Sequence, residues 1–192
     1  MKKTILILLI LLLINILNLY PVKKEYNFNS VRIDKDQYEI NFDFESTLYE
    51  NELIDVFYDA KEIKKYLNPI LQVKETASTE STQDLEYVIL VLFYKSTVIY
   101  KREIIKDQNE ISFYISNFTQ NVEIIPNIIE SKGYFKVFMK DGKSIINYYQ
   151  NYKLAKEFSN QYLSFSNMQA EAFCKSMCKY VRKLEADKLN NK

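Results

Sequence analysis

The chain has 192 residues, of which 47% are hydrophobic and 27% charged, and its formal net charge is +1. This length is typical of one domain, the composition excludes a disordered chain, and the balanced charge gives no electrostatic basis for binding nucleic acid. The absence of histidine and the presence of only two glycines exclude Ser-His-Asp and Cys-His catalytic sites and glycine-rich phosphate loops, so we expect binding rather than catalysis, with no catalytic residue, cofactor or metal.

Residues 1–26 differ in composition from the rest of the chain. Lys2 and Lys3 precede an apolar run that extends from Ile5 to Tyr20. A basic start followed by an apolar segment is typical of a secretory signal, and the run is at the short limit of a membrane span, which takes about 20 residues. We therefore expect an exported protein, periplasmic or extracellular. Its N-terminal helix is either removed as a signal peptide or retained as a membrane anchor, and residues 27–192 form one domain.

The first elements of that domain are a strand and a helical stretch. Apolar and polar side chains alternate from Tyr38 to Phe44, which predicts a half-buried strand. Ser46 or Thr47 can cap the helix that follows. A second helical piece, 61–66, should end before Pro69, because the residue preceding a proline disfavours the helical conformation.

Residues 70–154 predict a series of strands. Residues 70–76 form a short strand, and residues 76–84 (TASTESTQD) read as a polar loop. Five further strands are expected, at residues 85–94, 97–107, 111–115, 132–140 and 143–154. The first of these is almost continuously apolar, which predicts a central position in the sheet. Asp141-Gly142 between two alternating runs predicts a tight hairpin, and Gly133 inside a strand suggests a bend or a bulge.

A single amphipathic helix is predicted from near Ser166 to near Lys188. Its apolar side recurs at helical spacing and consists of Ala170, Phe173, Cys174, Met177, Val181 and Leu184. Cys174 and Cys178, the two cysteines, lie one turn apart, where a disulfide would be strained. We expect them to pack as small apolar side chains, with a redox or metal role as the alternative.

This order of elements predicts an α+β fold, in which a curved sheet is crossed by the terminal helix and an apolar cavity lies between them. Three segments, 98–103 (VIYKRE), 133–137 (GYFKV) with the Asp141-Gly142 turn, and 167–184, resemble the START-like (SRPBCC) superfamily of helix-grip domains. The resemblance covers residues 31–187. It implies a curved antiparallel sheet wrapped around the long C-terminal helix, as in lipid-transfer and polyketide cyclase-like proteins.

Arg102 is the most distinctive polar residue of the strands. Alternation places it on the same strand face as Val98 and Tyr100. If that face is concave, Arg102 is a buried cation that could hold a lipid phosphate or carboxylate. The alternative is a surface arginine paired with Glu103 or Glu110.

Tyrosines are the second polar feature of the strands. They occupy positions 87, 100, 114, 134, 148 and 152. An apolar ring with a polar tip suits the lining of a pocket for an amphipathic molecule. Ordinary β-propensity is the alternative explanation for any one of them.

We expect this chain to bind a hydrophobic or amphipathic small molecule, above all a lipid, with membrane contact through the N-terminal segment if it is uncleaved. The expected ligand contacts are Tyr100, Arg102, Phe113, Ile115, Val137, Met139, Phe173, Met177 and Val181. Two alternatives stay open. One is a cyclase- or hydratase-like enzyme of the same superfamily, which needs a tyrosine, arginine or acid in the cavity. The other is a non-catalytic interaction module at the cell envelope, which needs an exposed apolar patch.

Overall fold

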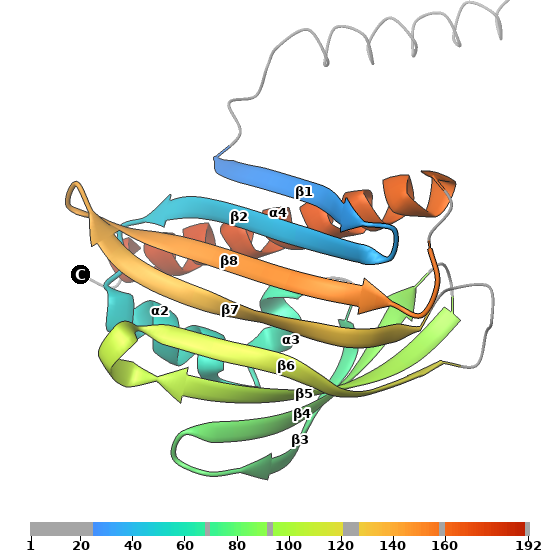
Figure 1. The fold of residues 1–192 in the computed structure, drawn as a ribbon. Helices are drawn as coiled ribbons and strands as arrows, with labels where there is room; N and C mark the ends of the chain where they lie inside the picture. The colour runs from blue at the N-terminus through green and yellow to red at the C-terminus, as the bar shows by residue number, and fades with distance from the viewer. Residues whose placement is uncertain (1–24, 68–69, 92–93, 121–126, 158–159, 191–192) are drawn as a thin grey trace, which may run out of the picture.

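The computed structural model describes residues 25–67, 70–91, 94–120, 127–157 and 160–190. These residues form one antiparallel sheet of eight strands and a helical layer dominated by the terminal helix (Figure 1). The strand order is β1-β2-β8-β7-β6-β5-β4-β3. The strands are β1 (Tyr26–Asp34), β2 (Gln37–Ser46), β3 (Ile70–Ser78), β4 (Thr82–Val91), β5 (Tyr94–Ile105), β6 (Glu110–Gln120), β7 (Ile128–Lys140) and β8 (Lys143–Leu154). The helices are α2 (Glu50–Tyr58), α3 (Ile63–Tyr66) and α4 (Asn160–Asn190), with a 3₁₀ turn η1 (Lys106–Gln108) after β5.

Strand β1 was not predicted from the sequence. It pairs antiparallel with β2 and forms one edge of the sheet. Its half-buried residues Tyr26, Phe28 and Ser30 alternate with exposed Asn27 and Asn29. This alternation, which directly follows the apolar N-terminal run, was not recognised as a strand. β1 begins at Tyr26, one residue before the expected domain boundary. Residues 1–24 of the expected signal or anchor segment, 1–26, lie outside the described residues. Within the part of the chain that is described, no helix is long and apolar enough to span a membrane.

The β3–β4 region corrects two predictions. The segment expected as a polar loop is a hairpin, in which β3 and β4 extend into it and leave only residues 79–81 as the turn. The Thr79 hydroxyl accepts a hydrogen bond from the Thr82 amide and bonds the Thr82 hydroxyl, and these contacts close the turn. β4 lies next to edge strand β3 and is not central. The apolar run predicted a central strand, but the apolar residues on its outer face are explained by strand propensity and do not require burial on both faces.

The β7–β8 hairpin agrees with its prediction. Asp141 and Gly142 both have positive φ values, 51° and 77°, as a two-residue hairpin turn of this type requires. In β7, Gly133 lies under the Phe113 ring. A Cβ at this position would lie 2.1 Å from the Tyr149 carbonyl oxygen and 2.7 Å from Phe113 Cζ. Any residue with a side chain would clash here, so the close approach of β6, β7 and β8 at this point requires a glycine.

The helices all cover one face of the sheet, which we call the inner face (Figure 1). α4 packs on β1, β2 and α3, whereas α2 packs on β6 and β7. α4 begins six residues before the predicted Ser166 and ends two residues after Lys188. Since every helix lies on this face, the inner face is where an interior site can form.

Candidate functional site

One end of the interior, beneath α2 and the middle of α4, is filled by aromatic rings. Phe42 stacks on Tyr148 with ring centres 4.7 Å apart, and Phe173 of α4 meets both rings edge-on at 5.3 and 5.1 Å. Phe135 continues the contact at 4.8 Å from Tyr148 and 5.8 Å from Phe57 of α2. These spacings are those of a closed aromatic core.

The inner face becomes polar on one side of this core. The Tyr148 hydroxyl donates to Gln150 Oε1 at 2.7 Å, and Gln150 Nε2 donates to Ser131 Oγ at 2.8 Å. Tyr100 lies beside Ser131 and Gln150. We call these four residues, Tyr100, Ser131, Tyr148 and Gln150, the Gln150 cluster. Burial raises the pKa of Tyr100 and of Tyr148 well above the usual value, so both hydroxyls are protonated donors at neutral pH.

The Gln150 cluster lies where β6 and β7 part. Their pairing runs only from Glu110–Lys136 to Tyr114–Lys132, and the strands diverge beyond it (Figure 1). Ser131 is the next residue of β7 and is 1% exposed. Tyr100 and Ile115, which are partners across β5 and β6, are both half-buried. The inner face is therefore less tightly covered here than at the aromatic core.

Arg102 is buried, with 4% of its surface exposed, and it points to the end of helix α2. Nη1 donates to the carbonyl oxygen of Tyr58 and to Gln83 Oε1, both at 3.4 Å, and Nη2 donates to the carbonyl oxygen of Phe57. Its guanidinium also lies 5.4 Å from the centre of the Tyr58 ring. The last carbonyls of a helix carry partial negative charge and lack partners in the helix, so Arg102 caps α2 from strand β5.

This geometry differs from both sequence readings of Arg102. The residue is inside the protein, as the concave-face reading expects. However, its donors are directed at main-chain and amide oxygens of the protein itself, and the Tyr66 and Tyr87 hydroxyls also lie beside it. Neither Glu103 nor Glu110 pairs with it among the described residues, and Glu110 pairs with Lys136 instead.

The remaining predicted contact residues fall into three groups. Val137, Met177 and Val181 are 1%, 0% and 0% exposed, so they are buried in the core. Met139 is on the expected face but lies beside the hairpin turn, where it is 49% exposed and outside the interior. Tyr100, Ile115 and Phe173 are half-buried, whereas Phe113 is 7% exposed. Ligand contact at these positions stays a prediction.

The sequence reasoning missed Ser131 and Gln150. Gln150 occupies an inner-face position between Tyr148 and Tyr152, and its alternation with Tyr149 and Asn151 was visible in the sequence. Ser131 lies one residue before the predicted start of its strand. A polar residue at an inward position of a predicted strand was the available signal.

The two cysteines are buried on α4, at 0% and 4% exposure, as predicted for packed apolar side chains. Burial raises the pKa of the Cys178 thiol, which disfavours the reactive thiolate. Among the residues that the structure describes, no group of three or more Cys, Asp and Glu side chains could hold a metal ion.

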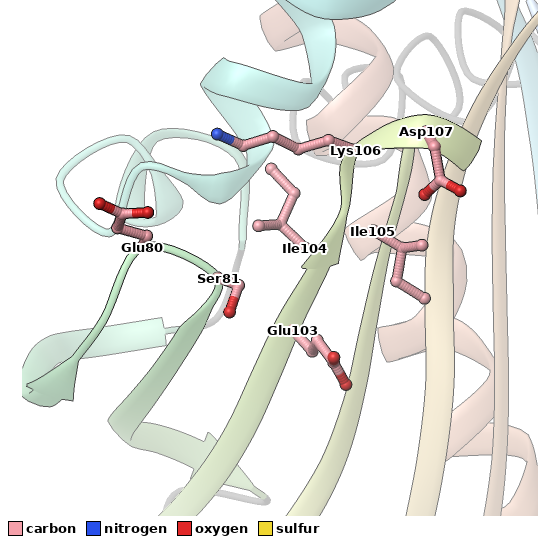
Figure 2. A pocket seen from close by; sticks show the side chains of 7 residues that line it. All are labelled: Glu80, Ser81, Glu103, Ile104, Ile105, Lys106 and Asp107. Atoms are coloured by element: carbon pink, nitrogen blue, oxygen red, sulfur yellow. The ribbon is translucent and has the colours of Figure 1, made fainter.

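A hollow of about 450 Å³ lies elsewhere, at the surface formed by the β3–β4 turn and the end of β5. It is open to solvent, and Figure 2 shows Glu80, Glu103 and Asp107 around it without a common focus. Acidic side chains spread over an open surface form neither a metal site nor an acid–base pair.

Comparisons with known proteins find similar structures but no similar sequence among family models and curated proteins. No family model and no curated protein matches the sequence. Solved structures do match, and they come from the START-like superfamily. One is a STAR-related lipid transfer protein from Xanthomonas axonopodis, with a TM-score of 0.63 and 10% identity, covering 85% of this chain and 97% of that one.

Two further matches are an aromatase/cyclase and a human protein. The Zhui aromatase/cyclase from Streptomyces sp. R1128 has a TM-score of 0.64 and 10% identity over 78% of this chain and 94% of that one. Human STARD10 has a TM-score of 0.60 and 14% identity over 88% and 78%. The described domain therefore has the START-like helix-grip fold.

Proposed function

We propose that this chain binds a hydrophobic or amphipathic small molecule on the inner face of its sheet, beside the Gln150 cluster. The observation that carries the proposal is the difference between the two ends of the interior. Around Val137 and Met177 the core is closed, whereas Tyr100 and Ile115 keep accessible surface next to buried hydrogen-bonding groups. Apolar surface with a few convergent polar groups is the usual composition of a small-molecule site.

The likeness of the fold to that of a lipid transfer protein and of an aromatase/cyclase supports this proposal. Burial raises the pKa of Tyr100 and of Tyr148, so neither hydroxyl serves as a general base at neutral pH. We also propose that the domain acts outside the cytoplasm, released or tethered by its N-terminal segment, because that segment has the pattern of an export signal.

Two measurements test the proposal. Native mass spectrometry of protein purified from its own host should show a co-purifying small molecule, and the protein mass should show whether the N-terminal segment has been removed. After delipidation, the protein should bind the neutral apolar fluorophore N-phenyl-1-naphthylamine saturably, at one site per chain.

A pair of neighbouring variants locates the site. Ile115→Trp adds bulk to the half-buried inner face and should abolish the saturable signal. Tyr114→Trp adds similar bulk on the outer face, where Tyr114 is 53% exposed, and should leave binding intact. Circular dichroism melting shows that both variants are folded. Equal binding by the two variants, or no saturable binding by the unaltered protein, would refute the proposal.

A further inference from the structure

The exposed side of helix α4 carries a row of lysines. Lys175, Lys179 and Lys183 are spaced four residues apart, so they lie on one side of the helix, and all three are exposed. We call them the lysine face. We propose that the lysine face lies on the surface of a bilayer that contains anionic lipids, with its ammonium groups beside the lipid phosphates. The inference rests on the tethered form of the proposed function, in which the N-terminal segment is retained in the membrane.

The charges of the lysine face are not neutralised within the protein. None of the three lysines has an ion pair or a hydrogen bond among the residues that the structure describes. No acidic residue lies between Glu171 and Glu185 in the sequence of α4, and Asp187, one turn beyond Lys183, forms no ion pair with it. Five lysines of the outer sheet face, in contrast, each pair with an acidic side chain, namely Lys101, Lys132, Lys136, Lys143 and Lys153. An unpaired row of cations on a helix is complementary to an anionic surface.

The described part of the chain begins beside the lysine face. Glu25, the first described residue, accepts a hydrogen bond from Arg182 Nε at 3.0 Å, and Cys178 Sγ lies 3.9 Å from its Oε2. Each of these two α4 residues directly precedes a lysine of the face. The N-terminal end of the domain therefore lies at the edge of the lysine face.

The length of chain before Glu25 limits the distance to the membrane. The apolar run ends at Tyr20, and the chain from there to Glu25 spans at most about 18 Å when fully extended. Lys23 and Lys24 lie within this stretch and add positive charge. A bilayer that holds the apolar run keeps α4 close to its surface, which favours a lipid partner over a nucleic acid or an acidic protein. The helical side of the domain, and not the outer sheet face, then faces the bilayer.

The tether makes a weak attraction sufficient. Each lysine near an anionic membrane increases the affinity about fivefold, so three increase it by about 100-fold. Because a tethered domain is always near the bilayer, this gain sets its orientation and not its attachment. Salt weakens the attraction, since the screening length falls from about 10 Å at 0.1 M salt to about 4 Å at 0.5 M.

Fluorescence quenching in vesicles tests the inference. The full chain is reconstituted into vesicles of phosphatidylcholine, either alone or with about 30% phosphatidylglycerol, and both contain a lipid with a nitroxide on its head group. A nitrobenzoxadiazole label at Ala186→Cys reports on the lysine face, because Ala186 is exposed and lies one turn beyond Lys183. A label at Tyr114→Cys on the outer sheet face is the control, and the unaltered chain, whose two cysteines are buried, gives the background labelling.

The two labels should respond differently to anionic lipid. We expect the Ala186→Cys label to be quenched at least about twofold more strongly in the vesicles with phosphatidylglycerol at about 0.1 M salt, and equally in both kinds of vesicle at about 0.5 M. The Tyr114→Cys label should show no difference at either salt concentration.

Two triple variants separate the lysine face from net charge. The first combines Lys175→Gln, Lys179→Gln and Lys183→Gln and should abolish the extra quenching of the Ala186→Cys label. The second combines Lys132→Gln, Lys136→Gln and Lys153→Gln on the outer sheet face. It lowers the net charge equally and should keep the extra quenching.

Two results would overturn the inference. Equal quenching of the Ala186→Cys label in the two kinds of vesicle, or an equal response of the two triple variants, would leave these lysines as a solvated helix face. Ligand binding, measured with N-phenyl-1-naphthylamine, does not depend on that result. A chain that fails to float with phosphatidylcholine vesicles is not tethered, which would overturn the tethered form of the proposed function and this inference together.

Discussion

Replacement of Arg102 by methionine tests the role that the structure gives this residue. Methionine fills a similar volume with an unbranched apolar chain but donates no hydrogen bond. Three oxygen acceptors, the carbonyls of Phe57 and Tyr58 and the Gln83 side chain, would lose their partner inside the protein. The end of α2 would also lose the cation that faces its negative pole.

The size of the effect follows from these losses. Each buried acceptor left without a partner costs about 1–3 kcal/mol. Water can reach part of the helix end, and methionine avoids the cost of burying a charge. We therefore expect Arg102→Met to lower the free energy of unfolding by about 2–4 kcal/mol. In a domain of this size that corresponds to a melting temperature lower by about 5–15 °C.

Urea unfolding followed by circular dichroism measures this change. Lys101→Met is the matched control, because Lys101 directly precedes Arg102 in β5 and lies on the outer face. Its ion pair with Asp84 spans 3.9 Å between half-exposed side chains. Such a pair contributes at most about 0.5–1 kcal/mol. A loss for Arg102→Met no larger than that of the control, together with weaker binding of dodecanoate, would show that Arg102 serves an anionic ligand instead of α2.

Three further predictions concern the rest of the fold. Gly133→Ala should destabilise the protein by about 3 kcal/mol or more, because the added methyl group would lie 2.1 Å from a backbone carbonyl oxygen. Gly142→Ala has open space around it but a φ of 77°, and should cost about 1 kcal/mol. Urea unfolding compares the two variants, and equal losses of stability would contradict the predicted clash at Gly133. Cys178 is buried and the pKa of its thiol is raised, so it should react with a thiol reagent at pH 8 at least about tenfold more slowly in the native protein than in urea. Equal reaction rates would show that the helix does not protect the thiol. Burial acts to raise the pKa of Glu185, but hydrogen bonds from the Thr47 amide and other partners outweigh it and lower the pKa below its usual value. Its stabilising effect should therefore be present at pH 7 and disappear as the pH falls below 4, so Glu185→Gln should destabilise the protein at pH 7 and not at pH 3; a difference that persists at pH 3 would refute this assignment.

The elements that the sequence predicted well are those with an uninterrupted local pattern. β8 has its predicted bounds, 143 and 154, because alternation runs through the whole segment and the Asp141-Gly142 turn marks its start. α4 contains its predicted range because its apolar side chains repeat at helical spacing. The prediction for residues 76–84 failed because threonine, serine and aspartate suit an exposed edge hairpin as well as a loop.

The sequence by itself determined the class of fold and the terminal helix, since the period of apolar side chains is a local property that each segment carries alone. Only the tertiary structure decided what the interior polar groups do. Arg102 faces the end of α2, 44 residues earlier in the chain, and Gln150 meets Ser131 through the pairing of β7 with β8. The folded sheet also separated Val137 and Met177, which are buried in the core, from Tyr100 and Ile115, which are half-buried at the inner face. Contacts of this kind depend on how distant segments pack together, and no periodicity within one segment records them.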